Sequence, residues 1–120
     1  MKSGTIPAWN RDLDALDASV EKVRKRDLLM AQKHAENGKP AKTKKVLTHL
    51  IRMIMMATQI VEQGRITDFE CANEIFDTLQ YSYHLSSWDT FEEEVVPIEE
   101  AEYAKFKERV GEERRRGGGR

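Results

Sequence analysis

No lysine or arginine occurs in residues 66–104, although the chain of 120 residues carries 20 basic and 21 acidic side chains in total. That stretch holds eleven acidic residues, whereas residues 22–52 hold ten basic residues against two acids, Asp27 and Glu36. The formal net charge of −1 therefore hides one basic region and one acidic region. Charge divided in this way suits a partner of complementary sign, or stacking of the chain on a second copy of itself.

Cysteine and long apolar runs are also scarce. The single cysteine, Cys71, excludes a disulfide within the chain, so nothing in the sequence favours secretion. No apolar run approaches the roughly 18 residues that a membrane span needs, and the first residues show no charged-then-apolar leader pattern. We therefore expect a cytoplasmic protein that does not bind membranes.

Strand signals are missing as well, since no run alternates apolar and polar residues between hairpin turns. Helical periodicity is present instead, and it predicts an all-α protein: a compact helical bundle of three long helices plus a C-terminal helix. Residues 1–113 are predicted to form a single domain of this kind. Residues 114–120, three arginines followed by three glycines and an arginine, are predicted to form a flexible basic tail.

The first two helices have clear ends. The first is predicted from near Pro7 to the Asn37-Gly38 pair, and the second is predicted to stop at Gly64. The apolar positions of the first helix form a heptad line in which Asp27 takes one position, and Arg52 is a candidate ion-pair partner for it. The second helix is apolar nearly all round, which places it at the centre of the bundle or in an oligomer interface.

The later helices are less sharply defined. Thr67 to Glu70 forms a capping-box pattern, which predicts a third helix ending near residue 86. Its predicted buried face is Phe69, Ala72, Ile75, Phe76, Leu79 and Tyr83. Pro97 predicts an extended chain just before it, and a C-terminal helix over residues 98–113. The acids at 92–94 and at 99, 100 and 102 are interpreted as solvated.

Sequence patterns for catalysis or metal binding are weak or missing. There is no Glu-x-x-His pair, no Cys-x-x-Cys pair, no glycine-rich phosphate loop and no nucleophile elbow. Cys71 has no feature that would lower its pKa, and its predicted role is that of a small, half-buried residue. We therefore expect no enzyme, no catalytic residue, no metal ligand and no cofactor.

The function favoured by these observations is a non-enzymatic interaction or assembly protein. It would self-associate, forming a homo-oligomer, or dock on a larger complex, through its segregated basic and acidic faces. The wide apolar arc of the second helix and the heptad line of the first favour self-association, because a small monomer cannot easily bury both. The predicted contact residues are Trp9, Leu13, Leu16, Met55, Glu70, Glu74, Asp77 and Tyr81.

Two alternatives stay open. One is a protein that binds the phosphate backbone of a nucleic acid through its basic region and the start of the second helix, where backbone N–H groups are free. Its predicted phosphate-binding residues are Lys25, Arg26, Lys42, Lys44, Lys45 and Arg52. Against it, the basic stretch contains no aromatic side chain on which a base could stack. The other alternative is an acidic decoy that inhibits a nucleic-acid-binding protein, as small phage-type inhibitors do.

Overall fold

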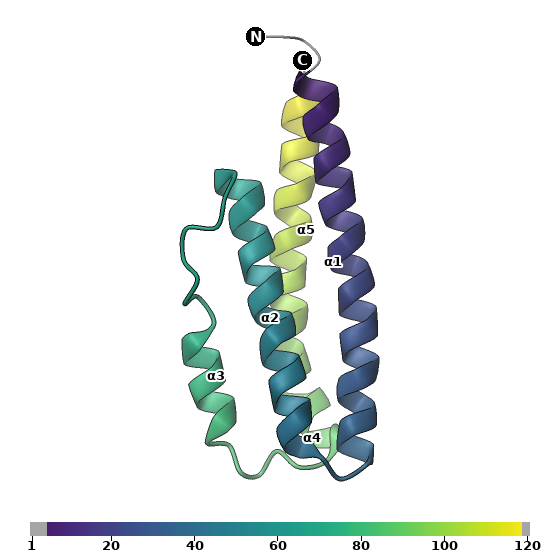
Figure 1. The fold of residues 1–120 in the computed structure, drawn as a ribbon, viewed down its shortest axis with the longest axis vertical. Helices are drawn as coiled ribbons and strands as arrows, with labels where there is room; N and C mark the ends of the chain where they lie inside the picture. Colours follow the sequence, from purple (N-terminus) through teal and green to yellow (C-terminus); the bar gives the residue numbers. More distant parts are fainter. Residues whose placement is uncertain (1–4, 119–120) are drawn as a thin grey trace.

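The computed structural model describes the backbone of residues 5–118 and the side chains of residues 12–116. This part of the chain is all-α and contains no strand. Its helices, in chain order, are α1 (Thr5–Glu36), α2 (Pro40–Gln63), α3 (Asn73–Gln80), α4 (Trp88–Glu94) and α5 (Val96–Gly118). The prediction of an all-α bundle is confirmed, but the three long helices that pack together are α1, α2 and α5 (Figure 1). The molecule measures 54 × 24 × 17 Å.

The ends of α1 and α2 lie where the sequence predicts them. Gly38 and Gly64 both adopt positive φ, +74° and +79°, the left-handed conformation that glycine accepts without steric cost. The amide of Gly64 donates a hydrogen bond of 2.8 Å to the carbonyl of Ile60 and so closes α2. Pro40 begins α2, where the missing N–H of proline costs nothing. A short turn thus joins two antiparallel long helices.

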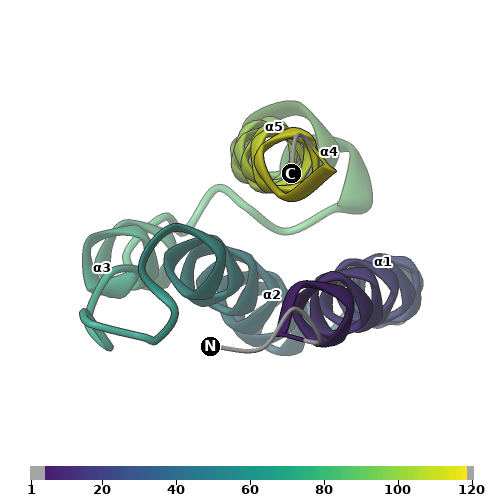
Figure 2. The same cartoon turned by 90° about the horizontal axis from the view of Figure 1, so that it is seen from above.

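The second helix lies at the centre of the bundle. It packs against α1, α5 and α3 (Figure 2). Its buried apolar side chains contribute to both hydrophobic clusters of the core: Leu50, Ile54, Ala57 and Val61 to one, and Leu47 and Ile51 to the other. The predicted central position of this helix follows from its wide apolar arc, because each neighbour covers only a part of that arc.

The start of α3 differs from the prediction. Residues 67–72 are not helical, with a turn at 69–72, and the helix begins only at Asn73. The side chain of Gln59 on α2 explains the delay: its Oε1 accepts hydrogen bonds from the amides of Thr67 and Asp68, both at 2.8 Å, and its Nε2 donates to the carbonyl of Asp68 at 3.0 Å. A capping box would satisfy the amides of Thr67 and Glu70. Here the amide of Thr67 donates to Gln59 and that of Glu70 donates to the Asp68 carboxylate at 2.9 Å, so the capping-box prediction is wrong.

The predicted buried face of α3 is correct only in part. Ala72 and Leu79 are buried and Ile75 is half-buried, but Phe69, Phe76 and Tyr83 are exposed. The helix has eight residues and contacts α2 alone among the helices, so it cannot bury a broad apolar stripe. Three aromatic rings are therefore left on the surface beside α2.

The chain stays helical around Pro97, contrary to the prediction. Val95 closes α4 in the right-handed helical region, with its amide donating to the carbonyl of Phe91 at 2.8 Å, and α5 begins at Val96. Proline is tolerated here because the first-turn amides of a helix need no intrahelical partner. At the other end, α5 continues to Gly118, so residues 114–118 of the predicted flexible tail are helical, and residues 119 and 120 lie outside the described part.

One of the acids predicted to be solvated is the most deeply buried charge of the bundle. Glu99, on α5, is 0% exposed, and both of its oxygens accept hydrogen bonds from the guanidinium of Arg24 on α1, one of them at 3.0 Å. This hydrogen bonding raises the pKa of Arg24, against the opposing effect of burial. The same guanidinium lies 4.3 Å from the centre of the Tyr103 ring, a cation–π contact. A two-point ion pair therefore joins α1 to α5.

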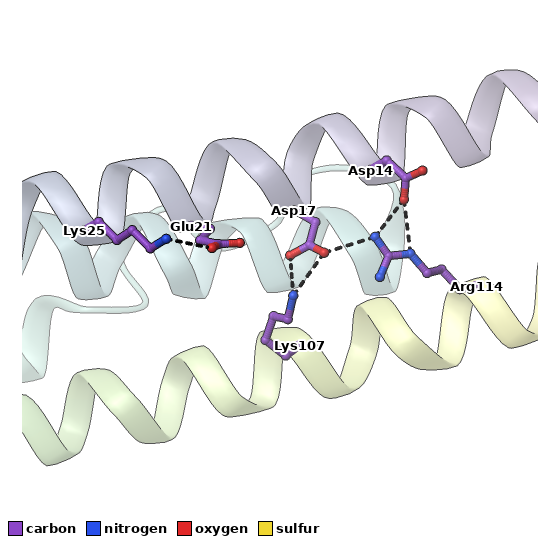
Figure 3. A network of polar contacts seen from close by, with 6 residues as sticks. All are labelled: Asp14, Asp17, Glu21, Lys25, Lys107 and Arg114. Atoms are coloured by element: carbon purple, nitrogen blue, oxygen red, sulfur yellow. Dashed lines mark hydrogen bonds and ion pairs between the residues drawn. The ribbon is translucent and has the colours of Figure 1, made fainter.

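A second set of ion pairs joins the same helices nearer their other ends (Figure 3). The buried carboxylate of Asp17 on α1 accepts hydrogen bonds from Lys107 at 2.8 and 3.0 Å and from Arg114 at 3.0 Å. Arg114 also donates to Asp14 at 2.7 Å, and this bond raises the pKa of the guanidinium. Arg114, predicted to lie in a flexible tail, is thus part of the contact between α1 and α5.

Asp27, the charged residue on the apolar line of α1, is buried and accepts a hydrogen bond from its neighbour Arg26 at 3.1 Å. The predicted pairing with Arg52 is not formed. No helix in the described part of the chain is long and apolar enough to span a membrane.

Candidate interaction surfaces along α2

An apolar groove of about 490 Å³ runs between α1 and α2. Its described lining residues are Leu16, Ser19, Val20, Val23, His49, Arg52, Met53, Met56, Ala57, Ile60 and Ile66. None of them comes from α5, which packs on both α1 and α2 from one side (Figure 2). The bundle is therefore closed by a third long helix on one side only, and this groove is the part of the α1–α2 pair that α5 leaves uncovered.

The edges of this groove carry positive charge. Arg52 lines it directly, and Lys22 and Arg26 each lie three residues beyond a lining residue of α1, near the edge of that helix face, with Arg26 paired to Asp27. All three are exposed. Asp12, one turn before Leu16, is an exposed acid near one end of the face. We call the groove and its three cations the basic groove.

The acidic residues among the predicted contact residues lie on the outer side of α3 and are exposed. Glu74 and Asp77 project from the helix itself, Glu70 lies in the preceding turn, and Tyr81 follows at the helix end with 65% of its surface exposed. Phe69, one residue before Glu70, is also exposed. Carboxylates and aromatic rings therefore occur together on this surface, which we call the acidic face.

A second groove, of about 740 Å³, lies between the first half of α2 and α3. Its walls combine cationic and aromatic side chains: Lys44 and Lys45 from α2, and Phe76 and Tyr83 from α3 and the residues after it. The Nζ of Lys44 lies 5.8 Å from the centre of the Tyr83 ring, within cation–π range. No carboxylate is among the described residues that line this basic–aromatic groove.

This groove is the feature that sequence reasoning missed. The basic stretch has no aromatic residue of its own, but the fold places two aromatic residues of the acidic region against it. Phe76 and Tyr83 were predicted to be buried, so the sequence did not indicate that their rings could stack on a base. Their presence removes the argument made above against nucleic acid binding.

The six predicted phosphate-binding residues do not form one patch. Lys42, Lys44, Lys45 and Arg52 lie along α2, whereas Lys25 and Arg26 lie on α1 and are paired with carboxylates of the same helix. The amides of Lys42 and Thr43 both donate to the carbonyl of Lys39. The start of α2 is therefore not the open set of N–H groups that was expected.

The predicted contact residues of α1 and α2 differ in how deeply they are buried. Leu16 is half-buried and lines the basic groove, and Met55 is half-buried against the core. Leu13 is fully buried in the core formed by α1, α2 and α5, which leaves none of its surface for a partner. The side chain of Trp9 lies outside the described residues.

Leu13 should therefore matter for folding. Replacing it by Ala is expected to lower the free energy of unfolding by about 2–5 kcal/mol, because the substitution removes buried methyl groups and leaves a cavity. Urea unfolding followed by circular dichroism measures this loss. Leu29→Ala is the matched control on the same helix: Leu29 is 56% exposed, and its replacement should change stability by no more than about 0.5 kcal/mol. Equal losses in the two variants would show that Leu13 is not a core residue.

The described residues give no geometry for metal binding, since no three His, Cys, Asp or Glu side chains converge in residues 12–116. Cys71 is half-buried, and burial raises the pKa of its thiol, with a smaller contribution in the same direction from Asp68. The thiol is therefore a poor nucleophile near neutral pH.

Fold and surfaces together define an all-α bundle with a basic groove, a basic–aromatic groove and an acidic face. No family model, curated protein or solved structure matches the chain.

Proposed function

We propose that this chain is a non-enzymatic assembly protein that self-associates head to tail, with the acidic face of one copy on the basic groove of the next. The observation that carries the proposal is the basic groove, an uncovered apolar groove with a volume of about 490 Å³ that is bordered by exposed cations. A single chain of this fold leaves that surface in water, which favours a partner that covers it.

A second copy has the chemistry that the basic groove requires. The acidic face offers Glu74 and Asp77 to the cations of the groove, and it offers the exposed rings of Phe69 and Tyr81 to the apolar floor. Opposite charges across an interface speed association and fix orientation, while apolar burial in the middle of the interface supplies most of the affinity.

Charge also favours a head-to-tail arrangement over a symmetric dimer. A two-fold dimer built on the basic groove would place Lys22, Arg26 and Arg52 of one copy close to the same cations of the other, and like charges repel. Joining two different surfaces avoids this repulsion. Such an interface does not close on itself in general, so the assembly grows as an open chain or closes as a ring.

The test is the mass of the protein in solution, measured by light scattering after size-exclusion chromatography. The mass should rise above 13.9 kDa with increasing protein concentration at low salt, and fall back as salt screens the charges. Met56→Glu, which puts a carboxylate into the groove, should keep the protein monomeric. The control is Leu29→Glu, which adds the same charge at an exposed position outside the groove and should assemble like the wild type. A wild type that stays monomeric at every concentration and salt would refute self-association.

A further inference from the structure

The basic–aromatic groove borders the basic groove on α2, where His49 lines both, but its chemistry is different. Two lysines form one wall, and the other wall holds two exposed rings and the amide of Gln80. A smaller hollow continues along α2 from this groove, lined by Thr48, His49, Arg52, Ala72, Asn73 and Phe76. Cations thus follow one another along α2 over about two turns, with the rings of Phe76 and Tyr83 beside them.

Tyr83 is the residue of the groove whose exposure most clearly favours a bound ligand. Its ring is 81% exposed, although burying a large aromatic side chain would stabilise the protein. It lies under the ammonium group of Lys44, at 5.8 Å, so its ring has a cation beside it and an open surface for a flat ligand. Phe76, on the same wall, is 43% exposed.

We propose that the basic–aromatic groove binds single-stranded nucleic acid, with phosphates on Lys44 and Lys45 and bases stacked on Tyr83 and Phe76. Rings with an open face stack on any base, and the two adjacent lysines can neutralise neighbouring phosphates of the strand. Since the described lining contains no carboxylate, an anionic strand meets no repulsion inside the groove.

The surroundings of the groove favour a single strand over a duplex. Glu74 and Asp77 lie on the neighbouring outer side of α3, where they would repel the second strand and the wide phosphate surface of a double helix. A duplex also keeps its bases stacked on one another, out of reach of Tyr83 and Phe76.

The test is fluorescence anisotropy with a labelled oligodeoxythymidylate of about twelve nucleotides. Two lysines and Arg52 could contact about three phosphates, so affinity should fall roughly tenfold or more between about 50 and 200 mM salt. Lys44→Glu/Lys45→Glu should weaken binding by at least about tenfold at low salt. The control is Lys25→Glu/Lys33→Glu, which makes the same change of net charge at exposed positions of α1 and should bind within about threefold of the wild type.

Stacking is tested separately. Tyr83→Ala should weaken binding by at least about fivefold, and Tyr83→Phe, which keeps the ring, should bind within about twofold of the wild type. Because Tyr83 is exposed, neither change should disturb the fold. Equal effects of the two lysine pairs, full binding by Tyr83→Ala, preference for a duplex of the same length, or no binding by the wild type would each overturn the proposal. The titration does not require self-association, so this inference and the proposed assembly can fail independently.

Discussion

Replacing Arg24 by Met is expected to lower the free energy of unfolding by about 3–5 kcal/mol, the usual cost of leaving one partner of a buried ion pair alone. The remaining partner, Glu99, is completely buried, and both of its oxygens are bonded to Arg24. The cation–π contact with Tyr103 is lost at the same time. A protein of this size has a total stability of only about 5–15 kcal/mol, so the variant should lose a large fraction of it.

Urea unfolding of three variants measures this effect and assigns it to the pair. Lys25→Met is the matched control on the next residue: Lys25 pairs with Glu21 at 3.0 Å, but both are exposed, and the expected loss is at most about 0.5 kcal/mol (Figure 3). Arg24→Met/Glu99→Leu replaces both charges by apolar groups and should recover most of the lost stability. A single variant as stable as the wild type, or a double variant no better than the single one, would contradict a buried pair that joins α1 to α5. These unfolding experiments are run in high salt, which suppresses self-association, so that the variants are compared as monomers.

The second large effect concerns assembly. Lys22→Glu/Arg52→Glu should reverse the sign of the basic groove, and Glu74→Lys/Asp77→Lys should reverse the acidic face. Either variant then carries two surfaces of the same sign, so each should be monomeric at concentrations where the wild type assembles. All four side chains are exposed, and we expect each variant to unfold at a urea concentration close to that of the wild type.

The sequence predicted those parts of the fold that depend on local signals. Gly38 and Gly64 end their helices because the left-handed conformation is a property of single residues. The central position of α2 follows from its own apolar arc. Local signals failed where distant residues compete for the same groups. Gln59 accepts from the amide of Thr67, one of the two that the capping-box pattern would have satisfied, and Arg24 pairs inside the bundle with Glu99, which is 75 residues away.

The candidate surfaces were harder to predict for the same reason. The separation of charge along the chain is visible in the sequence, and the exposed acidic residues of α3 are where it places them. The basic–aromatic groove, however, joins Lys44 to Tyr83, which are far apart in sequence and meet only because α3 folds back along α2. Nor does periodicity show which side of α1 and α2 a third helix covers. Part of the apolar arc that suggested an oligomer is buried by α5, and the basic groove is the part that α5 leaves open.

The most direct test of head-to-tail assembly is the mass of an equimolar mixture of the two charge-reversed variants. The intact acidic face of the first variant fits the intact basic groove of the second, and the reversed face of the second fits the reversed groove of the first, so both contacts can form in alternating order. Each variant alone should stay at 13.9 kDa, whereas the mixture should assemble again, with a mass that rises with concentration and falls in high salt. A mixture that stays monomeric, or variants that still assemble on their own, would contradict an interface formed by the acidic face and the basic groove.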